Sequence, residues 1–159
     1  MLGGGDSNIN PIVRYNCGYM TGLKNVRAVV HSLNRDKNGV IIEPLRVVTH
    51  SMGAAFGKGF IQAIIDFATK NKELLKDLKI SEYDFAPYQP YHQQAVNGVA
   101  TFQYSHNDDS VAGADRIKGA NYMKPSNAYG GHSINSFLDE IKRLPEGNYR
   151  YMNGTFVKQ

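Results

Sequence analysis

The feature that most restricts the fold of this chain is a short apolar run joined by a tight polar turn to a long helical pattern. Residues 45–49 (LRVVT) are apolar and β-branched, which is typical of a buried strand in a parallel sheet. Residues 52–70 place Phe56, Phe60 and Ile64 on one stripe, which predicts a helix. A strand followed at once by a helix is the building unit of parallel sheets. We therefore expect an α/β fold.

The rest of the chain alternates between strand and helix patterns in a similar way. A helix is predicted over residues 23–34, where apolar residues recur at spacings of three and four: Leu23, Val26, Val29, Val30 and Leu33. Further strands are expected at 83–86, 99–104 and 120–123, and a further helix at 133–143. Residues 149–158 are expected to form a hairpin around a type I′ turn at Asn153-Gly154.

These elements predict one α/β domain over residues 1–159, built in three layers. A short, mostly parallel sheet lies between flanking helices, and the chain ends in a C-terminal β-hairpin. The segment 1–12 is rich in Gly and Asn and is expected to be flexible, whereas 13–22 is compatible with either a short strand or a turn.

Composition excludes several classes of function. The formal net charge is only +4, and the basic residues are scattered, so no nucleic-acid-binding patch is predicted. The single cysteine, Cys17, rules out an intrachain disulfide, and the histidines show no metal-ligand spacing. We find no signal peptide and no run of about 20 apolar residues that would span a membrane. The chain is therefore expected to be cytoplasmic or part of a longer exported protein.

The turn between the strand and the helix, residues 49–53 (THSMG), carries the candidate chemistry. A serine on such a turn stands at the N-terminus of the following helix, where free N–H groups and the helix dipole favour a negative charge. Ser51 is the candidate nucleophile, and the N–H of Met52 is a candidate donor to an oxyanion. Small residues such as Gly53 allow strand and helix to approach closely. The simpler interpretation makes Ser51 only an N-cap.

The string VVTHSMGAAFGKGF resembles the nucleophile elbow of the α/β-hydrolase superfamily, especially its lipases and esterases. In that family the turn commonly reads G-H-S-M-G, so Thr49 departs from the pattern while His50, Ser51 and Gly53 follow it. The resemblance implies a serine nucleophile followed along the chain by an acid and then a histidine. It implies no cofactor, and it covers residues 23–143.

Two later segments fit the acid and the histidine that the resemblance implies. The strand at 99–104 leads into Asp108 and Asp109, either of which fits the acid, with Asp109 followed by the expected apolar residues. His132 stands in a glycine-flanked loop before a helix and fits the histidine, with His106 as its main competitor. The implied reaction is attack of Ser51 on an ester or acyl carbonyl of a small molecule or lipid.

The segment before residue 45 is short for such a fold, because only 44 residues precede Leu45. We therefore expect the N-terminal strands of the family to be missing, so that the chain corresponds to a truncated or C-terminal part of it. An unpaired sheet edge invites a second copy or a partner chain to complete the sheet. The alternatives to an active serine hydrolase are a non-catalytic, incomplete module and the C-terminal domain of a larger secreted effector.

Overall fold

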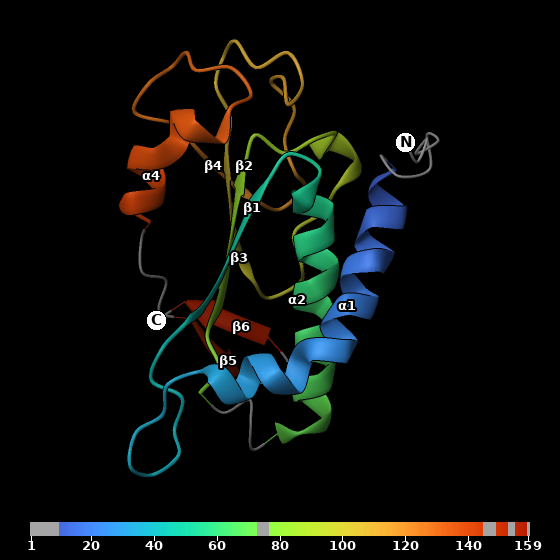
Figure 1. Cartoon of the computed structure of the whole chain (residues 1–159), viewed down its shortest axis with the longest axis vertical. Coiled ribbons are helices and arrows are strands. Elements are labelled where there is room, and N and C mark those ends of the chain that lie inside the picture. The colour runs from blue at the N-terminus through green and yellow to red at the C-terminus, as the bar shows by residue number, and fades with distance from the viewer. Residues whose placement is uncertain (1–9, 73–76, 145–148, 153–154, 159) are drawn as a thin grey trace, which may run out of the picture.

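The computed structural model describes residues 10–72, 77–144, 149–152 and 155–158. Figure 1 shows the path of the chain through these residues. The main helices are α1 (Pro11–Ser32), α2 (Gly53–Lys70) and α4 (Leu138–Lys142), with single 3₁₀ turns at η2 (Pro90–His92) and η3 (Ile134–Phe137). The strands are β1 (Leu45–His50), β2 (Ile80–Phe85), β3 (Ala100–Tyr104), β4 (Asn121–Met123), β5 (Tyr149–Met152) and β6 (Thr155–Lys158).

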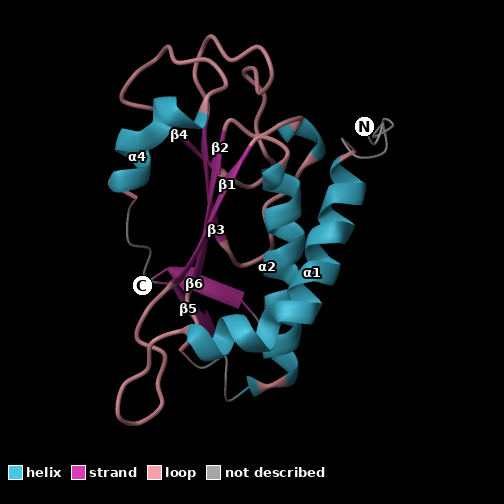
Figure 2. Ribbon diagram, viewed as in Figure 1, coloured by secondary structure: helices cyan, strands magenta, loops and turns pink. Residues whose placement is uncertain are grey.

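Strands β1 to β4 form one parallel sheet in which spatial order follows chain order, and Figure 2 shows them crossing the centre of the molecule. The register aligns Thr49 of β1 with Asp84 of β2. Because all four strands run the same way, the loops that follow them gather at one edge of the sheet. That edge receives the turn after β1 and the loops after β3 and β4.

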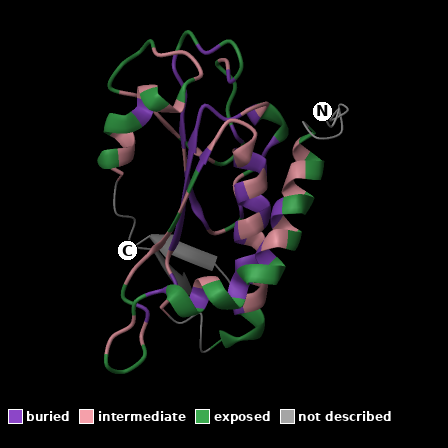
Figure 3. Ribbon diagram, in the orientation of Figure 1, coloured by how far each residue is buried: buried purple, intermediate pink, exposed green. Residues whose placement is uncertain are grey.

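The molecule has three layers, as predicted. Helices α1 and α2 cover one face of the sheet, and η3 with α4 covers the other, as Figure 1 shows. Two separate apolar clusters fill the spaces between the layers. The first includes Val26, Val30, Ile61, Ile64 and Ile80, and the second includes Tyr83, Phe85, Tyr104 and Phe137. Figure 3 shows that the strands and the inner side of α2 carry most of the buried residues.

Helix α1 begins at Pro11, so the expectation of a flexible segment over 1–12 is wrong for its last residues. The segment 13–22 is also helical, neither strand nor turn. Asn10 caps the helix, because its side chain accepts a hydrogen bond from Ile12 N–H at 2.8 Å. Pro11 suits the first helical position, because the fixed φ of proline matches that of a helix. Residues 1–9 lie outside the described residues.

The close crossing of α1 and α2 explains why a segment with poor helix formers is helical. A Cβ on Gly18 would lie 1.9 Å from the carbonyl oxygen of Phe56, and one on Gly59 would lie 1.9 Å from that of Tyr15. Only glycine permits backbones this near to each other. Packing against α2 thus offsets the intrinsic cost of about 1 kcal/mol for glycine inside a helix.

Two further expectations concern the strands. Strand β2 begins at Ile80, earlier than the predicted 83–86, and every one of its residues is buried. Side chains alternate between the two faces of a strand, so Tyr83 and Phe85 enter one apolar cluster while Glu82 and Asp84 face α2.

Strands β5 and β6 pair antiparallel in a separate two-stranded sheet. The Asn153-Gly154 turn lies outside the described residues, so its type stays a prediction.

Candidate active site

Ser51 occupies a strained turn directly after β1. Its φ is 55°, in the left-handed region that costs a non-glycine residue about 1 to 2 kcal/mol. Three backbone hydrogen bonds hold it there. Ser51 N–H donates to the carbonyl of Phe85 at 3.1 Å, and its own carbonyl accepts from Ala54 N–H at 3.2 Å and from Tyr88 N–H at 3.1 Å. The chain segment after β2 therefore fixes the conformation of the serine.

Thr49, which departs from the family pattern, is accommodated by a hydrogen bond and by a glycine further along α2. Its buried hydroxyl donates to Asp84 Oδ1. A Cβ added to Gly53 would lie 3.9 Å from Thr49 Cβ, an ordinary contact, whereas one added to Gly57 would lie 2.5 Å from Thr49 Cγ2. The close approach expected at Gly53 therefore occurs at Gly57, one helical turn later.

The structure brings Ser51, His132 and Asp109 into one hydrogen-bonded chain. His132 Nε2 lies 2.7 Å from Ser51 Oγ, although the two residues are 81 positions apart. On the other side of the ring, His132 Nδ1 lies 3.0 Å from both carboxylate oxygens of Asp109. The His132 side chain is 27% exposed and that of Asp109 is fully buried. The imidazole thus faces solvent while its acidic partner does not.

Asp109 is held as a carboxylate in spite of its burial. Burial acts to raise the pKa of this group, but hydrogen bonds from Ala112 N–H, His132 and Val111 N–H outweigh it and leave the pKa below its ordinary value. Both backbone bonds reach Oδ1, at 2.9 Å from Ala112 and 2.8 Å from Val111. A buried, ionised carboxylate against Nδ1 orients the ring and stabilises its cationic form.

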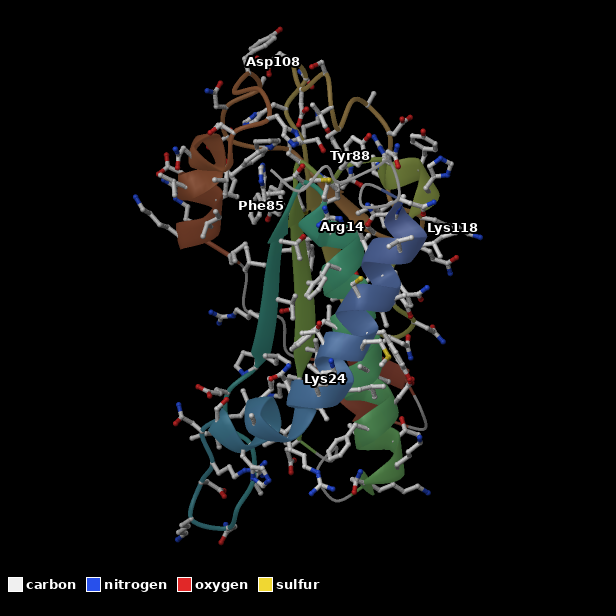
Figure 4. All side chains as sticks on the ribbon, turned by 45° about the vertical axis from the view of Figure 1, so that its right-hand side comes forward. Arg14, Lys24, Phe85, Tyr88, Asp108 and Lys118 are labelled. Carbon is white, nitrogen blue, oxygen red and sulfur yellow. The ribbon has the colours of Figure 1, made fainter. Side chains whose placement is uncertain are left out.

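Asp108, the rival candidate for the acid, binds a different part of the same loop. Its Oδ1 accepts hydrogen bonds from Gly130 N–H and Gly131 N–H, each at 3.0 Å. These two bonds, that from Gly130 first, lower the pKa of the exposed Asp108 carboxyl. Figure 4 shows Asp108 at the loop-rich end of the molecule. Asp109 is therefore the carboxylate at the imidazole of His132, and Asp108 is bonded to the backbone before it.

Two other histidines lie near this loop in roles that the sequence did not indicate. His50 Nε2 lies 2.7 Å from the carbonyl oxygen of His132, and the two rings are 5.0 Å apart. His106, the competitor for the catalytic histidine, is buried and contacts Asn127 O and Ser136 Oγ, both at 2.8 Å. The ring nitrogens of His106 are thus engaged away from Ser51.

The N-terminus of α2 supplies the candidate site for an oxyanion. Met52 stands in the cap position of this 18-residue helix, and no side chain makes a capping hydrogen bond there. The first N–H groups of a helix are free donors and carry its positive partial charge. Arg14 Nη2 lies 3.5 Å from Met52 Sδ, which brings the start of α1 beside the turn. Figure 4 shows Arg14 and Tyr88 at the same end of the molecule.

A cluster of buried charges lies behind the turn, between α2 and the sheet. Lys58 Nζ lies 3.2 Å from Glu82 Oε1 and 2.5 Å from Asp84 Oδ2, and all three side chains are almost completely buried. Thr101 Oγ1 donates to Glu82 Oε2 at 3.1 Å. Asp84 also accepts from Thr49, so this buried charge cluster is connected to the serine turn.

The cluster contains one cation and two carboxylates, and its ionisation follows from that. Burial raises the pKa of Glu82 to about 8, and the neighbouring Asp84 adds to the effect. Burial acts to lower the pKa of Lys58, but Asp84 and Glu82 outweigh it and raise that pKa. At neutral pH the cluster thus holds Lys58 as a cation, with a proton on Glu82.

This proton makes the stability of the fold depend on pH. Folded Glu82 keeps its proton up to about pH 8, whereas the unfolded carboxyl ionises near its ordinary value of 4.5. The contribution of Glu82 is therefore fully present below about pH 4.5 and is lost as the pH rises to 8, by at most about 1.4 kcal/mol per pH unit. We expect urea denaturation at pH 5, 6.5 and 8 to show wild type losing stability relative to Glu82→Gln. If the free energy of unfolding changes equally with pH in both proteins, Glu82 is ionised in the folded state.

Two pockets lie near the site without including its three linked residues. One, of about 230 Å³, lies between α1, α2 and η2, and its lining residues are Pro11, Ile12, Tyr15, Ala55, Lys58, His92, Gln93 and Gln94. The other, of about 260 Å³, is lined by Ser105, Asn107, Tyr122, Lys124, Pro125 and Ala128. The segment after β2 bounds the first pocket, and the loops after β3 and β4 bound the second.

Within the described residues, no group of three or more His, Cys, Asp or Glu side chains is arranged to hold a metal ion. None of the helices in the same part of the chain has the length and hydropathy to cross a bilayer. Comparison with known protein families, with curated proteins and with solved structures finds no match to this chain.

Proposed function

We propose that this protein is a serine hydrolase of the lipase or esterase type within the α/β-hydrolase superfamily. The observation that carries the proposal is the chain of hydrogen bonds from Ser51 Oγ through the His132 ring to the Asp109 carboxylate. Nucleophile, acid and base follow one another along the sequence as Ser51, Asp109 and His132, which is the order of that superfamily. Each comes from a loop at the carboxyl edge of a parallel sheet, where α/β proteins place their sites.

The protonation states follow from the hydrogen bonds. An ionised Asp109 can only accept, so the proton of a neutral His132 is on Nδ1 and the lone pair of Nε2 faces Ser51. His132 can then take the hydroxyl proton while Ser51 Oγ attacks a substrate carbonyl. The imidazolium that forms is stabilised by Asp109 and returns its proton to the leaving group.

The negative charge of the tetrahedral intermediate would develop at the N-terminus of α2. We assign Met52 N–H as one donor to that oxyanion. The acyl group stays on Ser51 until a water molecule, activated by His132, attacks the carbonyl and releases the acid. The reaction class implied is hydrolysis of an ester or related acyl compound.

Covalent labelling tests the proposal directly. We expect a fluorophosphonate probe to label the folded wild-type protein at Ser51, because the probe reacts only with an activated serine hydroxyl. Labelling should disappear in Ser51→Ala and persist in Ser110→Ala, a matched change at an exposed serine. Intact-protein mass spectrometry measures both. If wild type with native circular dichroism takes up no probe, the proposal is wrong.

A non-catalytic module is the second candidate, and the edge of the sheet favours it. In the described part of the chain β1 pairs only with β2, and Val48 on β1 is 46% exposed. A free edge with exposed apolar side chains can pair with a second copy or with a partner chain. Hydrolysis of p-nitrophenyl esters separates the two candidates, since equal rates for wild type and Ser51→Ala favour the module.

A further inference from the structure

The backbone around His132 is held by the residues that directly precede its two side-chain partners. His50 precedes Ser51, and its ring donates from Nε2 to the carbonyl oxygen of His132 at 2.7 Å. Asp108 precedes Asp109, and its Oδ1 accepts from the two N–H groups just before His132. Ser51 and Asp109 thus bind the side chain of His132, while His50 binds its carbonyl and Asp108 binds the two amides before it.

We propose that His50 and Asp108 are positioning residues, which together hold the His132 ring between Ser51 and Asp109. The inference rests on the proposed function, because it assigns a part in the same reaction. Neither residue contacts Ser51 Oγ through a recorded hydrogen bond, and each acts on His132 through the main chain. We call these three hydrogen bonds to the backbone the His132 clamp.

The loop needs such a clamp because its own backbone is permissive. His132 follows two glycines, and Gly131 has φ of +61° with nothing near the position of a Cβ. Glycine populates many conformations, so side-chain bonds to neighbouring segments must select one of them. A misplacement of about 1 Å at a reacting group can cost a factor on the order of 100 in rate. Two charge-assisted bonds to Asp108 and one to His50 oppose that freedom.

Other contacts anchor the two ends of the loop independently of the clamp. His106 binds Asn127 O and Ser136 Oγ, and Asn107 N–H donates to Ala128 O at 2.9 Å. Phe137 is fully buried beneath the loop and lies against the His106 ring. Gly130 is also packed against these anchors, since a Cβ on it would lie 2.6 Å from His106 Nε2. Loss of the clamp therefore frees Gly131 and His132 while the rest of the loop stays in place. The expected effect is on the reactivity of Ser51 more than on folding.

The kinetic test compares removal of each clamp contact with its conservative replacement. Asp108→Ala is expected to lower kcat for p-nitrophenyl ester hydrolysis by about 10- to 100-fold with little change in KM. The reason is that the His132 ring moves out of place and no longer takes the proton of Ser51. Asp108→Asn keeps an accepting oxygen and should retain most of the rate. His50→Phe and His50→Gln form the same pair for the other contact. Asp115→Ala, at an exposed acid, is the matched control.

A double-mutant cycle separates positioning from general damage. On a His132→Ala background, Asp108→Ala should have no further effect on the residual rate of p-nitrophenyl ester hydrolysis, because there is no ring left to position. An equal fold-loss on both backgrounds would show that Asp108 acts through the fold as a whole and would overturn the proposal. A wild-type rate in Asp108→Ala and in His50→Phe would also overturn it.

Hydrogen exchange tests the clamp without reference to activity. The Gly130 and Gly131 amides are bonded to Asp108, so Asp108→Ala should raise their exchange rates at least 10-fold and leave the Ala112 amide unchanged. If these amides exchange equally fast in wild type and variant, the clamp does not exist in solution. If the exchange of these amides speeds up in Asp108→Ala while wild type fails to react with the probe, the proposed function is wrong and the contact between Asp108 and the loop is confirmed.

Discussion

Replacing His132 with alanine is expected to slow ester hydrolysis by about 10⁶-fold, to the level of Ser51→Ala. The reason is the 2.7 Å contact between His132 Nε2 and Ser51 Oγ, which provides the only base bonded to that hydroxyl among the recorded contacts of the described residues. Asp109→Asn should be slower than wild type by about 10⁴-fold, because an amide at that place favours the wrong tautomer of His132. Steady-state kinetics with a p-nitrophenyl ester measures both variants.

The control for these variants is His31→Ala, which removes an exposed imidazole at the end of α1. It should leave the rate within about twofold of wild type, since surface changes of this kind alter stability by no more than about 0.5 kcal/mol. Circular dichroism and thermal unfolding must show that His132→Ala is folded. A folded His132→Ala variant with wild-type turnover would contradict the assignment of the base.

Replacing Lys58 with methionine is expected to lower the free energy of unfolding by about 3 to 5 kcal/mol. Lys58 is the cation of the buried charge cluster, and its loss leaves the carboxylate of Asp84 buried without a counter-charge. Methionine fills a similar volume, so the loss is electrostatic more than a matter of packing. Urea denaturation at pH 7, monitored by circular dichroism, measures the change.

Lys70→Met serves as the matched control, because Lys70 ends the same helix and is exposed. It should change the free energy of unfolding by no more than about 0.5 kcal/mol. If Lys58→Met loses as little stability as Lys70→Met, then something other than Lys58 stabilises the buried carboxylate. Because Asp84 also accepts from Thr49, Lys58→Met is further expected to reduce the reactivity of Ser51.

The local patterns of the sequence determined the sheet and the order of the candidate site residues. An apolar β-branched run predicted β1, and the helical stripe that follows it predicted α2, because each pattern depends only on neighbouring residues. The positions of Ser51 and His132 followed from short motifs beside these elements. The first half of α1 was missed, although Asn10-Pro11 is a helix start signal, because the glycines in this half have low helix propensity.

Only the tertiary structure could distinguish the two adjacent carboxylates. Asp108 and Asp109 fit the same motif, and the three-dimensional path of the loop directs one to the His132 ring and the other to the backbone before it. The buried polar residues of β2 could not be predicted either, because the carboxylate of Asp84 is stable in the core only when Lys58 of α2 lies against it, and Glu82 keeps its proton there. Sequence patterns report which faces of an element are apolar. The partner of each buried charge is decided by how distant elements pack, since a charge inside a protein is stable only beside its counter-charge.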